Sequence, residues 1–146
     1  MVQVKKILLA MDFSEAADKL AEYAKLYTET FDAELYVLYV SPTMNRYAKL
    51  YVTPSSIDDL VGKILEGAKT AMDEYMEKYF KGLKAKSMVE YGYAPVRIIE
   101  VADEIGADMI VMGTHGRKGV DRILFGSVAE KVVKTAKMPV VTVRPF

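Results

Sequence analysis

The sequence predicts an α/β protein, a single doubly wound sandwich of five parallel strands with helices on both faces. Short apolar runs alternate along the chain with segments of helical period. Strands separated by helices imply parallel pairing with right-handed crossovers. The chain has 146 residues, of which 51% are hydrophobic and 27% are charged. That length suits one domain, residues 1–146, which can bury a core without disulfides.

Composition and charge exclude several classes of protein. Twenty basic residues balance twenty acidic ones, which argues against a protein that coats nucleic acid. The absence of cysteine excludes disulfides, thiolate metal sites and thiol catalysis, and it fits a reducing cytosol. The apolar stretch Ile7–Met11 is too short for a signal peptide, and no run approaches the ~18 apolar residues of a membrane span. We therefore expect a cytoplasmic protein with no membrane partner.

The first strand is expected at Lys6–Met11, a continuously apolar run typical of a strand covered on both faces. Ser14 is a candidate N-cap for the helix that follows. Apolar residues of that helix recur at 17, 20, 21, 24, 27 and 31. Glu34–Val40, rich in β-branched and aromatic residues, predicts the second strand.

A long helix is expected after residues 41–56, which contain two prolines and no clear period and are interpreted as a loop. Ser56 and Asp59 resemble a capping box at its start. The apolar face is Ile57, Leu60, Val61, Ile64, Leu65, Ala68, Met72, Tyr75, Met76 and Tyr79. Helical spacing favours core packing for these and for Tyr23 and Tyr27, so none is assigned a cofactor. Gly82 ends the helix.

The third strand lies within Leu83–Tyr91 and is more polar, which places it nearer a sheet edge. Pro95 suits the first turn of a helix, and Gly106 ends that helix. Met109–Met112 predicts the fourth strand.

The last two elements follow a glycine-rich connection. Ser127–Ala136 predicts a short helix that Pro139 breaks, and Val140–Val143 predicts the fifth strand.

The glycine-rich connection itself, GTHGRKGVDRILFGS, runs from Gly113 to Ser127. Its four glycines permit close backbone approach, so that several N–H groups can point at one anion, and the next helix adds a positive N-terminus. Arg117, Lys118 and Arg122 add charge, although each is also typical of an ordinary exposed surface. The alternative is a flexible surface loop with a capping box at Ser127. The chain contains neither G-x-x-x-x-G-K-[ST] nor G-x-G-x-x-G, which argues against a P-loop NTPase or a dinucleotide dehydrogenase.

Three strand ends are expected to meet around one crevice. Asp12, Val40 and Gly113 each stand at the carboxyl end of a predicted strand. In doubly wound sheets ligands bind beyond those ends, where the strand order reverses.

Gly113-x-x-Gly116, nine residues, then Gly126-Ser127 resembles the motif G-x2-G-x9-G-[ST] of the ATP-binding branch of the universal stress protein family. The resemblance covers nearly the whole chain, through ILLAMDFS, LYVLYV, ADMIVMGTHGR and MPVVTVRP. It implies a Rossmann-like sheet with strand order 3-2-1-4-5, and ATP as the ligand, with Mg²⁺ carried on the phosphates. A dedicated metal cage is not expected, although Asp121 or Asp12 could touch the ion through water.

The resemblance also implies roles for individual residues. Asp12 faces the ribose or adenine, and Val40 offers its backbone to the adenine beside Ala10 and Met11. The remaining residues line the ribose and phosphates: Met112, Gly113, Gly116, Gly126, Ser127 and Val128, with Arg117 nearby.

Two candidate site residues have alternative roles that the sequence leaves open. Asp12 is also a plausible N-cap of the first helix, a role compatible with the site. His115, the only histidine, has three possible roles: a proton carrier, a contact to ligand phosphate or ribose, or a solvated loop residue. No carboxylate or serine is spaced in sequence to form a triad with it, so no catalytic residue is assigned.

The fifth strand, Val140–Val143, stands at a sheet edge and is a template for pairing. Pro139 and Pro145 could instead blunt that edge. The resemblance favours a homodimer through residues 140–143.

Three functions compete: an ATP-dependent regulatory module of the stress response acting on an unknown protein partner, a slow ATPase or nucleotidyl-transferring enzyme, and a nucleotide-free dimeric scaffold. The intact glycine and serine spacing argues against the nucleotide-free scaffold. Because no base is evident, we expect no hydrolysis of ATP or only weak hydrolysis.

Overall fold

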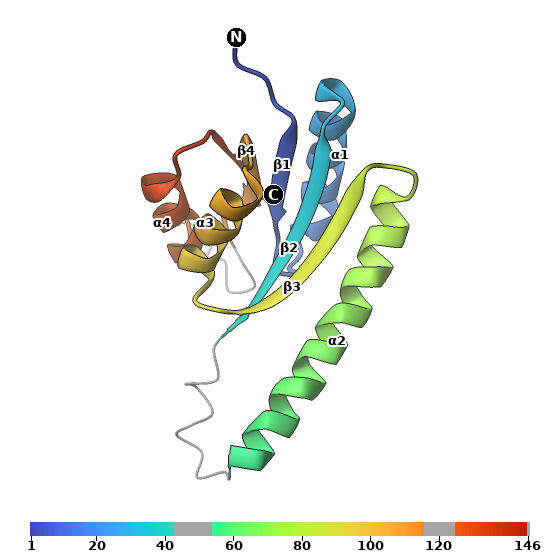
Figure 1. Cartoon of the computed structure of the whole chain (residues 1–146), viewed down its shortest axis with the longest axis vertical. Coiled ribbons are helices and arrows are strands. Elements are labelled where there is room, and N and C mark those ends of the chain that lie inside the picture. The colour runs from blue at the N-terminus through green and yellow to red at the C-terminus, as the bar shows by residue number, and fades with distance from the viewer. Residues whose placement is uncertain (43–53, 116–124, 146) are drawn as a thin grey trace.

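The computed structural model describes residues 1–42, 54–115 and 125–145, with side chains in the long helix described from residue 58 onward. A twisted five-stranded sheet lies between two layers of helices (Figure 1). The elements are β1 (Lys6–Ala10), α1 (Ala17–Phe31), β2 (Glu34–Pro42), α2 (Pro54–Phe80), β3 (Ala85–Gly92), α3 (Ala94–Ile105), β4 (Met109–Gly113), α4 (Ser127–Thr135) and β5 (Val140–Val143). Among the described residues, no helix is both long and apolar enough to cross a membrane.

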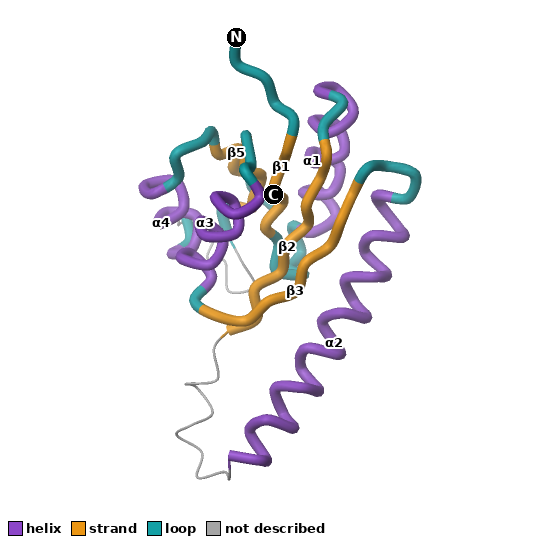
Figure 2. The backbone as a smooth tube through the Cα atoms, viewed as in Figure 1, coloured by secondary structure: helices purple, strands orange, loops and turns teal. Residues whose placement is uncertain are grey.

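The strand order is β3-β2-β1-β4-β5, and all four pairings are parallel. This confirms the predicted fold class and strand order. From β1 the chain adds β2 and β3 on one side and then β4 and β5 on the other. Right-handed crossovers therefore put α1 and α2 on one face and α3 and α4 on the opposite face (Figure 2). The more polar β3 occupies an edge, as its composition predicted.

The core consists of two clusters, one on each face of the sheet. Alternate residues of β1 supply them: Ile7 and Leu9 pack with α1 and α2, and Leu8 packs with α3 and α4. All three side chains are fully buried. Because both faces of β1 are covered, its sequence is continuously apolar rather than alternating.

The start of α1 differs from the prediction. Its N-cap is Ala16 and makes no side-chain cap, so neither Ser14 nor Asp12 is the N-cap. Instead, the Ser14 N–H donates to Asp12 Oδ1 at 3.1 Å, and the Ser14 carbonyl accepts from the Ala17 N–H at 2.9 Å. An aspartate two residues upstream competes for the backbone N–H, and this places a turn before the helix.

The long helix α2 begins at Pro54, two residues before the predicted capping box of Ser56 and Asp59, which is therefore wrong. Proline suits a first turn because its missing N–H has no intrahelical acceptor there. The predicted loop 41–56 is shorter at both ends, since β2 runs to Pro42, and residues 43–53 lie outside the described residues.

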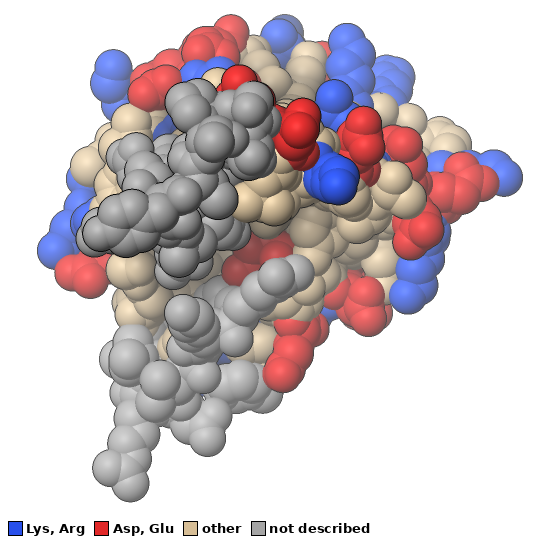
Figure 3. All heavy atoms as spheres, turned by 90° about the horizontal axis from the view of Figure 1, so that it is seen from below, with Lys and Arg blue, Asp and Glu red and all other residues tan. Residues whose placement is uncertain are grey.

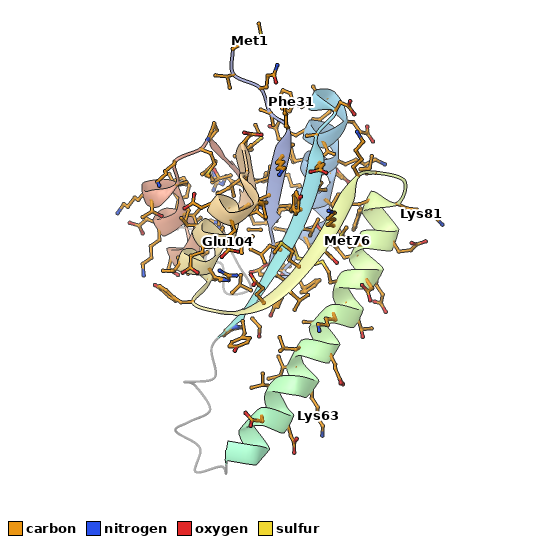
Figure 4. All side chains as sticks on the ribbon, viewed as in Figure 1. Met1, Phe31, Lys63, Met76, Lys81 and Glu104 are labelled. Carbon is orange, nitrogen blue, oxygen red and sulfur yellow. The ribbon has the colours of Figure 1, made fainter. Side chains whose placement is uncertain are left out.

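The apolar face of α2 packs on the sheet through its C-terminal half. Met72 and Tyr75 are buried, as the helical spacing predicted, whereas Tyr23 on α1 is 38% exposed. Figure 4 shows Met76 between α2 and β3, with Lys63 and Lys81 pointing away from the sheet.

Two glycines end elements as predicted, because each adopts a positive φ. Gly106 is the C-cap of α3 at φ 70°, and Gly82 has φ 85° just beyond α2.

Candidate functional site

The carboxyl ends of β1, β2 and β4 meet at one edge of the sheet, and β2 extends furthest. Ala10 pairs with Leu38 and with Met112, and the Met11 N–H donates to the Leu38 carbonyl at 3.0 Å. Val40 lies two residues beyond Leu38, where its strand partner is Glu90 of β3. On the side of β1, the backbone of Val40 therefore lies past the end of the neighbouring strand.

Four predicted site residues from four elements share one apolar cluster. Ala10 and Met112 are buried in the cluster beneath α3 and α4, and Val40 and Val128 pack against it partly buried. Met11 is buried in the opposite cluster, beside α1. The sheet end is thus lined by apolar groups on the side where α4 begins.

The two ends of the glycine-rich connection are tied together. The Gly126 N–H donates to the Thr114 carbonyl at 2.6 Å, and the Thr114 N–H donates to the Val143 carbonyl at 3.0 Å. The residue after β4, Thr114, therefore lies directly against the start of α4, although eleven residues separate Thr114 from Gly126.

Close backbone approach explains why glycine occupies two of these positions. A Cβ on Gly126 would lie 3.1 Å from the Thr114 carbonyl oxygen. On Gly113 it would lie 3.3 Å from the His115 carbonyl oxygen and 3.6 Å from Leu20 on α1. The two contacts with carbonyl oxygens are tighter than most Cβ contacts, so a larger residue at either position requires the neighbouring backbone to shift by a few tenths of an ångström. The end of β4 thus touches the starts of both α1 and α4.

The N-terminus of α4 faces this junction. Its N-cap is Gly126, without a side-chain cap, so the alternative of a capping box at Ser127 is wrong. Glu130, the other member of that box, instead accepts from Lys134 Nζ at 2.8 Å. Ser127 is exposed, and the N–H groups of a first helical turn have no intrahelical acceptor. This end of α4 offers donors and partial positive charge to an anion.

Two polar side chains lie at the end of β1. Asp12 is partly exposed, and its carboxylate accepts the Ser14 N–H. The Ser14 hydroxyl oxygen is buried, and no residue in the described ranges hydrogen-bonds it. A buried hydroxyl without a partner is costly, which makes it a candidate to meet a polar ligand.

His115 is only 6% exposed, so the alternative of a solvated loop residue is wrong. Its Nδ1 lies 2.8 Å from Thr114 Oγ1. Thr114, also buried, was missed by the sequence analysis, although its place between Gly113 and His115 is a signal that could have found it.

The predicted cations lie beyond what the structure describes. Gly116, Arg117, Lys118, Asp121 and Arg122 all fall outside the described residues. Figure 3 views the molecule from the carboxyl ends of the strands. Acidic side chains lie between and beside the grey segments, and most basic side chains lie nearer the outline. Within the described ranges, no group of three His, Asp or Glu residues could hold a metal ion.

Taken together, these elements define a doubly wound α/β protein whose glycine-bounded connection closes at the point where the strand order reverses. The family model of the universal stress protein family matches residues 3–144. The chain belongs to the universal stress protein family.

Relatives and solved structures agree with this assignment. Universal stress protein MJ0531 of Methanocaldococcus jannaschii is 35% identical over 143 residues, which cover 96% of this chain and 82% of that protein. The solved structure of MJ0577, from the same organism, has a TM-score of 0.86 at 30% identity and covers 98% of this chain and 97% of that one. A universal stress protein of Archaeoglobus fulgidus, solved in complex with dAMP, shares the fold at 22% identity and a TM-score of 0.58, covering 97% and 98%.

Proposed function

We propose that this protein is an ATP-binding regulatory module of the stress response. The observation that carries the proposal is the hydrogen bond from Gly126 to the Thr114 carbonyl, which brings the end of β4 against the N-terminus of α4. A phosphate chain needs unpaired donors, positive potential and little side-chain bulk. The first turn of α4 offers N–H donors and partial positive charge, and Gly126 before it has no side chain. The Archaeoglobus relative with dAMP supports an adenine nucleotide as the ligand class.

Each part of the nucleotide has matching groups at this end of the sheet. The apolar surface of Ala10, Met112 and Val40 suits the adenine, and the backbone of Val40 beyond β1 suits its edge. Asp12 suits the ribose hydroxyls, which can donate to its carboxylate. The first turn of α4, from Ser127, suits the phosphates, with Gly116 and Arg117 as further contacts.

Mg²⁺ enters this proposal only with the nucleotide. Magnesium typically keeps several waters and binds through substrate phosphates, so the ion would be carried on the phosphates of the nucleotide.

A regulatory role is favoured over an enzymatic one because chemistry at the γ-phosphate needs a positioned water or base, and none of the predicted site residues is assigned as a base. Regulation instead needs two states of the protein for which ATP has different affinities, and a partner protein that distinguishes them. We propose that the module acts in the cytoplasm, as one domain spanning residues 1–146.

Ser127→Glu is the sharpest test of the phosphate site. A carboxylate in the first turn of α4 favours the helix dipole but repels phosphates, so stability is kept while nucleotide affinity is lost. Thr30→Glu is the control for added charge, because Thr30 is exposed beside Phe31 at the other end of the molecule (Figure 4). A carboxylate near the C-terminus of α1 opposes the helix dipole, so the two variants are compared in ATP affinity alone. Calorimetric titration with ATP measures both variants.

The wild-type protein is also purified without added nucleotide and denatured to identify what it releases. Released ATP, together with affinity lost only in Ser127→Glu, supports the regulatory module. Released ADP with steady turnover of ATP would favour an ATPase. No release and no binding on titration would leave a nucleotide-free scaffold.

We further propose that the protein is a homodimer paired through β5. The Ile110 N–H donates to the Pro139 carbonyl and the Thr114 N–H to the Val143 carbonyl, so odd-numbered residues of this strand bond to β4. The backbone groups of Val140 and Thr142 therefore point outward, where a second strand can pair.

Thr142→Pro tests the dimer because it removes one outward N–H and leaves the bonds to β4 intact. Thr142→Val keeps the backbone donor and is the control. Sedimentation equilibrium should give a monomer for the proline variant and a dimer for the control. Equal masses for both variants would count against pairing through this edge.

A further inference from the structure

Phe13 has an unusual backbone conformation at the carboxyl end of β1. Its φ is 59°, in the left-handed region that a bulky side chain rarely adopts. Among the described residues, Asp32 is the other non-glycine with a positive φ, and it is the C-cap of α1, where that conformation is common. Phe13 has no such helix end to account for its conformation.

Aromatic contacts hold Phe13 in this conformation. Its ring centroid lies 4.9 Å from that of Tyr39 on β2 and 6.3 Å, edge-on, from that of Tyr75 on α2. Tyr75 is itself fixed, because its hydroxyl donates to the Ala17 carbonyl at 2.7 Å. The Phe13 N–H meets Met11 Sδ at 3.3 Å. The ring is thereby anchored to β2, to α2 and, through Tyr75, to the start of α1.

The backbone of Phe13 controls the residues on either side of it. The hydrogen bond from the Ser14 N–H to Asp12 Oδ1 spans residue 13, so Phe13 is the middle residue of a turn closed by the Asp12 carboxylate. The backbone angles of Phe13 are thus among the torsions that fix where Ser14 N–H and the Asp12 carboxylate lie relative to each other.

We propose that Phe13 is a positioning residue of the nucleotide site, acting through Asp12. The aromatic anchor holds the left-handed backbone, and that backbone holds the carboxylate where a ribose can donate to it. This inference rests on the proposed function, because it assigns a role within the same site. The ring itself packs in the cluster between the sheet and α1 and α2, on the face opposite the one that Ala10 and Met112 occupy.

Phe13→Leu and Phe13→Gly both remove the aromatic anchor. Leucine keeps an apolar side chain but loses the ring contacts, and glycine accepts a positive φ without steric cost but loses the anchor altogether. Phe80→Leu is the control. Phe80 is 2% exposed at the C-terminal end of α2, and its ring centroid lies 5.6 Å from that of Tyr75. Phe80→Leu therefore removes a buried ring that packs on the same tyrosine but leaves the Phe13 side chain itself unchanged.

The first measurement is hydrogen exchange of the Ser14 amide in nucleotide-free protein. Both Phe13 variants should exchange about tenfold faster than wild type, since a lost hydrogen bond of ordinary strength has this effect. Phe80→Leu should leave the Ser14 amide protected. Wild-type protection in both Phe13 variants would overturn the proposal, because the carboxylate would then be held without the anchor.

The second measurement is a double-mutant cycle in ATP affinity. Phe13→Leu should weaken binding about tenfold in the wild-type background and have no further effect on Asp12→Ala, because its role is routed through that carboxylate. An equal loss in both backgrounds would mean that Phe13 acts by another route and would refute the proposal. If the wild-type protein binds no nucleotide, the proposed function fails, and Ser14 exchange alone decides whether Phe13 positions Asp12.

Discussion

Gly126→Ala tests whether the closed glycine connection depends on close backbone contact. Gly126 has φ −72°, so alanine meets no conformational strain there, and the effect is purely one of space. The new Cβ would lie 3.1 Å from the Thr114 carbonyl oxygen and 3.7 Å from His115 Cα. That carbonyl cannot easily move away, because Thr114 is also bonded to Val143.

The magnitude follows from two opposed effects. Weakening the bond from the Gly126 N–H to the Thr114 carbonyl, in a partly buried place, costs about 1–2 kcal/mol. Restricting the unfolded chain by replacing glycine with alanine returns about 0.5 kcal/mol. We expect a net loss of about 1 kcal/mol in the free energy of unfolding, and a melting temperature about 3 °C lower for a chain of this size.

Gly67→Ala is the matched control for urea unfolding. Gly67 lies inside α2 with nothing within 4 Å of an added Cβ, so alanine should stabilise by about 0.5–1 kcal/mol. The two substitutions are chemically identical and should have opposite signs. Equal stabilisation by both would show that the junction tolerates a methyl group and would refute the reasoning from close approach. ATP affinity should fall in Gly126→Ala and stay unchanged in Gly67→Ala.

Two further predictions concern the packing around the site. Burial, and then the charges of Tyr79 and Asp18, raise the pKa of Tyr75 above its ordinary value near 10. The unfolded chain loses this proton at a lower pH than the folded protein does. The contribution of Tyr75 to the free energy of unfolding is therefore complete below about pH 10, and above that pH it falls by up to about 1.4 kcal/mol per pH unit. Tyr75→Phe should remove this loss of stability above pH 10. It should also lower the free energy of unfolding by about 1 kcal/mol at pH 7, because the Ala17 carbonyl loses its donor. Urea unfolding from pH 7 to 11 measures both effects. Arg97 donates to three glutamates, so Arg97→Met should destabilise by about 1 kcal/mol at pH 7, less in high salt and below about pH 4. A loss independent of both salt and pH would contradict the ionic explanation.

Much of the fold could be predicted because its signals are local. Continuous apolar runs mark strands covered on both faces, and Gly106 and Gly82 end elements through conformations that favour glycine. Element boundaries were less predictable, because a helix cap contributes only about 0.5–2 kcal/mol and the local context decides between competing caps. At the start of α1, the Asp12 carboxylate takes the Ser14 N–H and displaces the helix start to Ala17.

Residues of the candidate site could be predicted where their type and their spacing along the chain form a motif. Residues whose conformation depends on tertiary packing could not. Gly113 and Gly126 belong to a spaced motif, and the structure brings both to the junction of β4 and α4. Phe13 carries no such signal, because its φ depends on rings contributed by β2 and α2, which are remote in sequence. Contacts of this kind become visible only once the fold is known.

If the protein binds ATP as proposed, the closed junction separates two contributions to that binding, one from the residues that the junction fixes and one from the cations of the connection. Thr114 and Gly126 are bonded to each other, and Thr114 is bonded in turn to β5. The residues before and after these two positions are therefore fixed by the sheet and by α4, whatever lies between. The cations that the sequence places between them, Arg117, Lys118 and Arg122, can then vary in strength of attraction without altering the donors at Ser127. If binding is divided in this way, neutralising all three cations should weaken ATP binding and reduce its salt dependence but leave unfolding by urea unchanged, since charges of that kind act at long range and are screened. A large loss of stability in the neutralised protein would show instead that the connection itself holds β4 and α4 together.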